Sequence, residues 1–318
     1  MRGAASSAEV ATPKRPAKAK APKAPKEVTP EERVAGAAMA AARALVTGGF
    51  SEDYRDVRAE VLRAFAMAFA GAYGMKAATL DANLDGMPFG DRQAFVNAVR
   101  SLDCSELTPE HYGHVHEKLS GWAIVGGVLT KTPGSTTVHF TPRSLTEGVV
   151  RTTLRPILAS LAPGASVLEL RVCDPAVGAG AFLVEAVRQL AQRLVDDGHE
   201  KDMIVAKRLV AVHCLYGTDI CPWAIASAKI AMWLECRAEC MPVGWLNDNL
   251  KVGDALVGLG FGEQLARFHW APDGKTKKGE LIAEDPAFRA VVDRAMETGV
   301  AARKARMAAL ASVARGGV

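Results

Sequence analysis

The sequence predicts an α-helical domain followed by an α/β domain with a parallel sheet, and two observations support this fold class. Up to about residue 135, apolar residues recur at helical spacing behind helix-start signals. After the polar stretch KTPGST at 131–136, short β-branched runs alternate with helical runs. Such alternation is typical of a parallel α/β sheet. The 318 residues allow about two domains of roughly 150 residues each.

The N-terminal tail holds the positive charge of the chain. The net charge is +4, yet residues 1–30 carry seven Lys and Arg against two Glu, and the remaining residues sum to −1. A segment rich in Ala, Pro and Lys cannot bury enough apolar surface to fold. We therefore expect residues 1–28 to be a disordered basic tail. It could hold DNA phosphates through counterion release, or serve only as a solubilising leader.

Neither a membrane span nor a disulfide framework is expected. The longest apolar run, at 64–75, is shorter than the roughly 20 residues that a bilayer requires. The six cysteines form no Cys-x-x-Cys pair, and several lie in apolar segments, so they are expected to be reduced core residues. These features predict a soluble, cytoplasmic protein.

The helical domain is expected to cover residues 29–135. Thr29, Pro30 and Glu32 form a capping-box start for a helix that runs to about Val46. Ser51 is expected to open a second helix, and helical pattern continues at 91–102 and 109–119.

Three strands are expected in the α/β part, at residues 167–173, 214–217 and 250–252. Apolar stripes at helical spacing follow the first two strands, through Leu183 and Val187 and then through Ile225 and Met232. Beyond Gly260 the pattern is helical again, with expected helices at 286–298 and 301–313.

The strongest local signal is the segment Asp-Pro-Ala-Val-Gly-Ala-Gly-Ala-Phe at 174–182, where a strand gives way to a helix. Glycines let the backbone turn tightly beside a ligand, and the first amides of a helix favour an anion. A dinucleotide site would place a third glycine where Leu183 stands. Asp174 could instead meet an ammonium while the amides meet a carboxylate. The methionine part of S-adenosylmethionine carries both groups.

With these residues the chain resembles the adenine-specific DNA methyltransferases of restriction-modification and phage-defence systems, over residues 110–270. The glycine segment is similar to the family's cofactor motif Asp-Pro-Ala-Cys-Gly-x-Gly-x-Phe, with Val177 in place of Cys. The resemblance implies that this motif binds S-adenosylmethionine through Asp174, Pro175, Ala176, Gly178, Gly180 and Phe182.

Three further segments resemble the family in the same order along the chain. Phe140, Thr141 and Pro142 look like the segment that lines the methionine pocket. Asp219 ends the second strand as the ribose-binding carboxylate does, and Ile220 would flank the adenine ring. Asp254 and Leu256 look like the Gly-Asp segment, whose carboxylate accepts from the adenine amino group of the cofactor.

The resemblance implies a Rossmann-like S-adenosylmethionine-dependent methyltransferase core over residues 136–262. The helical domain precedes it, and residues 263–318 look like a truncated helical insertion. The implied function is the cofactor-binding part of a site-specific methyltransferase that acts on the exocyclic amino group of adenine in double-stranded DNA. Two alternatives stay open: an RNA or protein methyltransferase, and a non-catalytic subunit that binds cofactor or DNA.

The family captures the flipped base with an Asn/Asp-Pro-Pro-aromatic tetrapeptide, and the chain contains no Pro-Pro pair. The nearest match is the stretch from Asp285 to Phe288. We therefore expect the chain alone to be inactive. Its sheet would lack the fourth strand, which leaves residues 167–173 as an open edge. Either a second polypeptide carries the catalytic and target-recognition parts, or the chain is a gene fragment.

Metal binding is not expected. His111, His114 and His116 are close in sequence, but only the first two would share a helix face, and no further ligands complete a tetrahedral site. His116, Glu117 and Leu119 also resemble the family's Leu-Gly-x-x-Tyr-Glu-x-Leu stretch, which implies a structural role for this segment.

Overall fold

The computed structural model describes residues 28–75, 89–104, 107–133, 140–241, 244–256 and 286–315. The tail expected to be disordered, 1–28, lies outside these residues except for Val28, which is exposed. The first part of the expected insertion, residues 263–285, also lies outside them.

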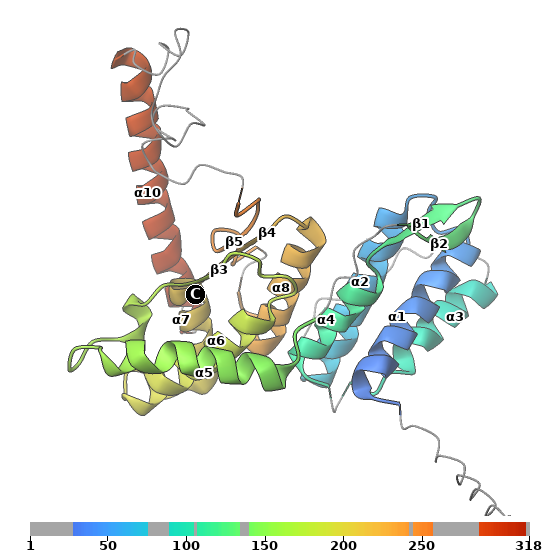
Figure 1. The fold of residues 1–318 in the computed structure, drawn as a ribbon, viewed down its shortest axis with the longest axis horizontal. Helices are drawn as coiled ribbons and strands as arrows, with labels where there is room; N and C mark the ends of the chain where they lie inside the picture. Colours follow the sequence, from blue (N-terminus) through green and yellow to red (C-terminus); the bar gives the residue numbers. More distant parts are fainter. Residues whose placement is uncertain are drawn as a thin grey trace, which may run out of the picture.

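The N-terminal part consists of four helices that pack side by side in Figure 1: α1 (Pro30–Thr47), α2 (Tyr54–Ala72), α3 (Phe89–Arg100) and α4 (Pro109–Lys118). The capping box at the start of α1 is confirmed: the Glu32 amide donates to Thr29 Oγ1 at 3.2 Å, and the Thr29 amide donates to Glu32 Oε2 at 3.1 Å. Helix α2 begins later than expected because Asp53, not Ser51, caps it.

A β-hairpin follows α4, although only helices were expected over residues 29–135. Strands β1 (Trp122–Val125) and β2 (Val128–Lys131) pair antiparallel through a turn at Gly126 and Gly127. Both glycines have positive φ, of 57° and 74°. A two-residue hairpin needs this backbone conformation, and Gly-Gly supplies it at little steric cost.

The α/β part contains a parallel three-stranded sheet of β3 (Val172–Asp174), β4 (Leu215–Asp219) and β5 (Leu250–Val252), in the order β3-β4-β5. Helices α6 (Ala181–Asp196), α7 (Met203–Cys214) and α8 (Pro222–Glu235) connect the strands. Within the described residues, β3 pairs with β4 only. It therefore lies at one edge of the described sheet.

The strand expected at 167–173 was too long. Val167–Glu169 forms a 3-10 turn, η1, in which Ser166 Oγ accepts from the Leu168 amide at 3.2 Å. A serine that bonds its own downstream backbone competes with strand pairing. Only the last part of the apolar run enters the sheet. The last pair in its register with β4 is Asp174 opposite Gly217.

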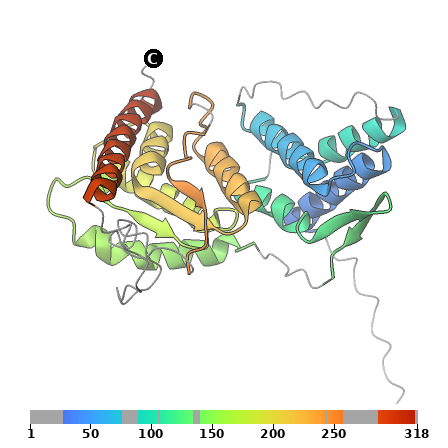
Figure 2. The same cartoon turned by 90° about the horizontal axis from the view of Figure 1, so that it is seen from above.

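Two further helices complete the described part. Helix α5 (Arg143–Ala159) runs between the hairpin and the sheet and packs against α6. Helix α10 (Pro286–Ala314) is continuous, although two helices were expected, because Gly299 lowers helix propensity without breaking the helix. Its C-terminal end is anchored through Leu310, Ala311 and Ala314, while the rest projects from the sheet in Figures 1 and 2.

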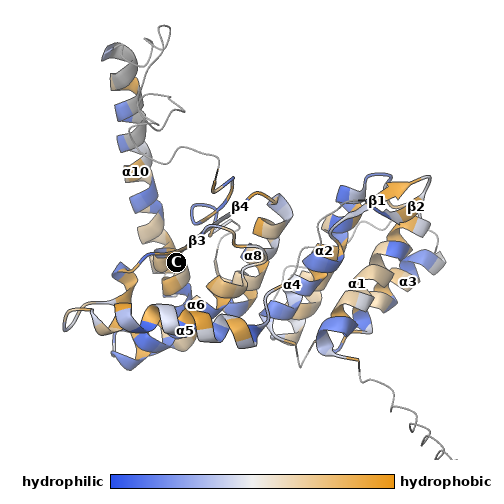
Figure 3. Ribbon diagram, in the orientation of Figure 1, coloured by the Kyte–Doolittle hydropathy of each residue, from blue (hydrophilic) through white to orange (hydrophobic). Residues whose placement is uncertain are grey.

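Two hydrophobic cores meet at α8, which Figure 3 shows as predominantly apolar. Leu234 is buried in the core of the N-terminal helices, whereas Met232 is buried in the core around the sheet. Trp233 packs partly against both cores. In the part of the chain that is described, no helix has the length and apolar character to cross a membrane.

Five of the six cysteines are either buried or exposed, and Cys221 is half-buried. Cys104, Cys214 and Cys236 are buried free thiols, as expected for core residues. Cys173 and Cys240 are exposed, which contradicts that expectation. Cys173 is the middle residue of the three-residue strand β3.

Candidate cofactor site

The candidate site is centred on the glycine turn, residues 175–180, between β3 and α6. Gly178 and Gly180 have φ of 54° and 90°, a left-handed conformation that other residues adopt only with strain. A Cβ on Gly180 would also lie 3.2 Å from the backbone of Ala228 in α8. Glycine thus permits both the turn and the close contact between two helices.

Two carboxylates hold the turn. Asp174 Oδ1 accepts from the Ala176 amide at 3.0 Å, and Asp219 Oδ2 accepts from the Gly178 amide at 2.9 Å. Asp219 Oδ1 accepts from the Cys221 amide at 2.8 Å, so both of its oxygens face backbone donors. Burial raises the pKa of Asp174, and the nearby charge of Asp219 raises it further.

The first turn of α6 offers backbone donors. Its N-cap is Gly180, which has no side chain to accept from the helix. The Gly180 carbonyl accepts from the Val184 amide, which is the first hydrogen bond of the helix. The amides of Ala181 and Phe182 have no hydrogen-bond partner among the described residues. Unpaired amides at a helix N-terminus attract an anion.

A small hollow of about 100 Å³, here called the inner hollow, lies beside the turn. Its lining comes from α4, from the segment before α5 and from the glycine turn: Gly113, His116, Glu117, Phe140, Thr141, Ala176, Val177, Gly178, Ala179, Ala181 and Phe182. The structure thus brings five sequence-predicted residues together at one hollow: Phe140, Thr141, Ala176, Gly178 and Phe182. Pro142 follows Thr141 in the sequence and is the N-cap of α5.

Gly113 makes room for Phe140 at the inner hollow. A Cβ on Gly113 would lie 2.3 Å from the Phe140 ring. The ring also packs against His114, with 4.8 Å between the ring centroids. A glycine inside a helix costs stability, and here it lets an aromatic ring from a later segment lie against α4.

Four further predicted residues, Asp219, Ile220, Asp254 and Leu256, lie at the carboxyl ends of β4 and β5. The Gly253 amide donates to the Asp219 carbonyl at 3.0 Å, which brings the segment of Asp254 next to β4. Asp254 Oδ1 accepts from the Leu256 amide at 2.8 Å. Ile220 is 71% exposed and Leu256 is 95% exposed. Exposed apolar side chains at the ends of two parallel strands suit a flat apolar ligand group.

A second hollow of about 220 Å³, the edge hollow, lies along β3. It is mostly apolar and is lined by residues of α5, β3 and α6: Val149, Val150, Thr153, Leu154, Val172, Cys173, Asp174, Pro175, Phe182, Leu183 and Ala186. Asp174 and Pro175, two predicted cofactor residues, line this hollow and not the inner one. Phe182 separates the two hollows, since it lines both.

The structure does not describe the side chains of the two catalytic candidates. Asp285 lies outside the described residues, and the side chain of Phe288 is likewise outside them. The backbone of Phe288 belongs to the first turns of α10, the end opposite to Leu310 and Ala314, which anchor that helix.

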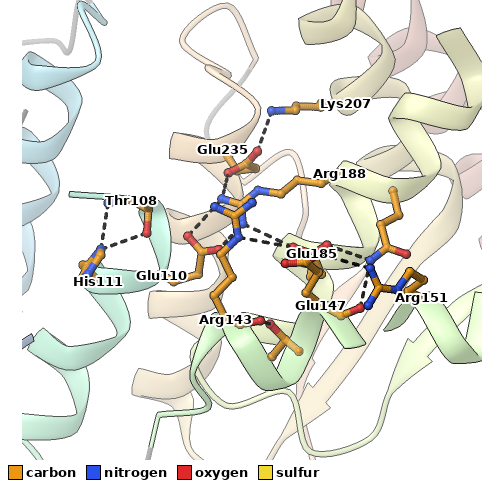
Figure 4. Close-up of polar contacts among 12 residues, drawn as sticks. Thr108, Glu110, His111, Arg143, Glu147, Arg151, Glu185, Arg188, Lys207 and Glu235 are labelled. Carbon is orange, nitrogen blue, oxygen red and sulfur yellow. Dashed lines mark hydrogen bonds and ion pairs between the residues drawn. The ribbon is translucent and has the colours of Figure 1, made fainter. Parts of the chain in front are cut away.

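An ion cluster that sequence reasoning missed joins the two parts of the chain (Figure 4). Arg188 of α6 donates to both oxygens of Glu110 in α4, and to Glu235 Oε2 in α8 at 2.5 Å. Lys207 donates to Glu235 Oε1 at 2.6 Å. Burial would raise the pKa of Glu110, but the Arg188 hydrogen bond and charge lower it below the ordinary value.

The three clustered histidines have separate environments. His111 closes the α4 capping box through the Thr108 amide, and His114 pairs with Glu117 at 3.0 Å. His116 lies on another face of α4, buried against Arg58. Within the described ranges, no group of three His, Cys, Asp or Glu residues is placed to hold a metal ion.

Comparison with known proteins bears on this region of the chain. The family described as MmeI, DNA-methyltransferase domain, matches residues 158–242, about a quarter of the sequence. That range contains the glycine turn, Asp219 and Ile220, but neither Phe140 nor Asp254.

A protein of Methanocaldococcus jannaschii, provisionally named a type II restriction enzyme and methyltransferase, is 24% identical to the chain. The alignment covers 46% of this chain and 17% of that protein, so the chain corresponds to a small part of a much longer relative. No solved structure matches. These similarities support a methyltransferase of the restriction-modification type, and the mixed α/β architecture is consistent with it.

Proposed function

We propose that the chain binds S-adenosylmethionine and forms the donor-binding part of a site-specific DNA methyltransferase that acts on the exocyclic amino group of adenine. Its core would be Rossmann-like and span residues 136–262, after the helical domain at 29–135. One observation carries the proposal: the glycine turn leads into unpaired first-turn amides of α6, and Asp219 of the next strand is hydrogen-bonded to that turn.

Each part of the cofactor has residues suited to it. The amides of Ala181 and Phe182 suit the carboxylate of the methionine part. Each Asp219 oxygen accepts one backbone bond and has a second lone pair, which suits the ribose hydroxyls. Ile220 and Leu256 offer exposed apolar surface for the adenine ring. When bound, S-adenosylmethionine supplies an electrophilic methyl group.

DNA as the substrate is supported by the matched family, whose description names a DNA-methyltransferase domain. The same finding favours DNA over RNA or protein as the substrate. The sequence has no Pro-Pro pair, so the proposal assigns donor binding to the residues named here and base capture to a segment that is not among them. A strand of that segment would find β3 bonded on one side only within the described sheet.

Calorimetric titration of the purified chain with S-adenosylmethionine and with S-adenosylhomocysteine tests the proposal. We expect both to bind, and Asp219→Asn to weaken binding by about 1.5 to 3 kcal/mol, the scale of a hydrogen bond to a charged group. NAD should not bind, because Leu183 occupies the position of the third glycine of a dinucleotide site.

Asp202→Asn is the matched control. Asp202 also accepts backbone bonds at a helix start, from Ile204 and Val205, but it caps α7 and lines neither hollow. Asn is an equally good cap. The affinity of the Asp202→Asn variant for S-adenosylhomocysteine should therefore equal that of the parent chain. A folded parent chain that releases no heat with millimolar cofactor would refute the proposed function.

A further inference from the structure

His116 is the buried polar residue at the inner hollow that has an unused hydrogen-bonding atom. Its side chain lies in α4, is 1% exposed and lines the inner hollow. Its Nε2 is buried and has no hydrogen-bond partner among the described residues. A buried donor without a partner costs about 1 to 3 kcal/mol, so its presence beside a hollow indicates a partner that arrives with a ligand.

The contacts of Arg58 determine which ring nitrogen of His116 carries the proton. Arg58 Nη2 lies 3.0 Å from His116 Nδ1. A guanidinium has only donors, so Nδ1 must accept, and the proton of the neutral ring is on Nε2. Burial, together with the charge of Arg58, lowers the pKa of His116 to about 4. The ring is therefore neutral near pH 7 and presents one N–H donor.

The Arg58 side chain is itself held in place. It donates to Ser120 Oγ at 3.0 Å and lies over the Trp223 ring of α8, with 5.1 Å between the guanidinium carbon and the ring centroid. Arg58 does not line the inner hollow. Arg58 therefore occupies the Nδ1 side of the His116 ring, and Nε2 is the ring nitrogen that remains for a ligand bound at the hollow.

Two independent sets of donors meet at the inner hollow. Ala181 and Phe182 belong to its lining, and their first-turn amides in α6 have no described partner; His116 belongs to the lining from α4. A carboxylate takes several donors at once and is the ligand group that a helix N-terminus favours. Glu117, also in the lining, is an acidic group of the kind that suits a neighbouring ammonium.

We propose that His116 is a cofactor-binding residue, whose Nε2–H donates to the carboxylate of the amino-acid part of the cofactor. This inference rests on the proposed function, since it names a contact of the same ligand. It extends the site to the helical part of the chain, because His116 comes from α4 and Arg58 from α2. Arg58 acts as a positioning residue that sets the tautomer of the ring.

Two ligands that differ in the carboxylate test this proposal. S-adenosylhomocysteine carries the amino-acid part, whereas 5′-methylthioadenosine lacks it. We expect His116→Leu to weaken S-adenosylhomocysteine binding by about 10-fold or more, the loss of a bond to a charged group, and to leave 5′-methylthioadenosine binding unchanged. His116→Gln keeps an N–H donor and should recover most of the lost affinity.

The controls separate the possible failures. If the parent chain binds neither ligand, the proposed function fails. If the parent chain binds S-adenosylhomocysteine and His116→Leu binds it equally well, only the His116 assignment fails. Equal losses for both ligands would give His116 a structural role and also overturn the assignment. Imidazole ¹⁵N chemical shifts of the parent chain provide a test without substitution: the Nε2–H signal should shift when S-adenosylhomocysteine is added.

Discussion

At the scale of single residues, the two glycines of the turn predict different costs of substitution. In Gly178→Ala a methyl group meets no atom within 4 Å, so only the left-handed backbone is strained, at about 1 to 2 kcal/mol. In Gly180→Ala the same strain is joined by contact with the backbone of Ala228. We expect Gly180→Ala to lower the free energy of unfolding more than Gly178→Ala, as measured by urea denaturation.

Gly36→Ala is the control for this comparison. Gly36 lies within α1, is exposed and has open space around it. Alanine there should stabilise the chain by about 1 kcal/mol, because the backbone is already helical. Equal effects at Gly178 and Gly180 would show that the contact between the turn and α8 is looser than described.

Residues with local partners could be predicted from the sequence, whereas those with distant partners could not. The capping box of Thr29 and Glu32 and the glycine turn were found because each pattern is complete within a few residues. The segment of His116 was assigned a structural role by resemblance, and its contact with Arg58, 58 positions away, was not predicted. Nothing in a local pattern reports such a pairing.

At the scale of elements, Arg188 links three helices and is expected to be hard to replace. Arg188→Met would leave Glu110 and Glu235, each less than 10% exposed, without their shared cation. Breaking a buried pair on one side costs about 3 to 5 kcal/mol. Arg193→Met on the same helix removes only an exposed pair with Asp197, and should cost about 0.5 kcal/mol or less.

The pH dependence of unfolding gives an independent test of this cluster. In the parent chain the lowered pKa of Glu110 contributes stability above its ordinary value of 4.5, and this contribution is lost as the pH falls below it. In Arg188→Met the buried Glu110 carboxylate loses its cation and favours protonation, so lowering the pH should reduce the destabilisation of the variant. The gap in unfolding free energy between the two chains should therefore narrow from pH 7 to pH 4. A constant gap would contradict the buried pairing.

Element positions were predicted better than element boundaries. Helices α6 and α8 followed from apolar periodicity, and β5 was predicted at its observed bounds. The strand at 167–173 was overextended because apolar residues fit a 3-10 turn as well as a strand, and Ser166 decides locally. The hairpin at Gly126 and Gly127 was missed because its four-residue strands are too short to establish a period of two.

At the scale of the whole molecule, the two hydrophobic cores are expected to unfold together because α8 belongs to both. Differential scanning calorimetry should show one transition for the described body, with equal calorimetric and van't Hoff enthalpies. Leu234→Ala removes apolar volume from the N-terminal core alone and should cost about 2 to 5 kcal/mol. It should shift that single transition as a whole. Two separate peaks would mean that the cores are independent.

The shared helix also has a consequence for synthesis on the ribosome. Helices α1 to α4 leave the exit tunnel before α8 is made, yet Leu234, Trp223 and Ile230 of α8 complete the contacts of their core. The apolar surface of α1 to α4 is therefore not fully covered until the glycine turn, α6, α7 and α8 have been made. Helices α1 to α4 thus emerge before α8 but reach their full packing only after it, so a pause in translation between α4 and α8 would expose them to chaperones.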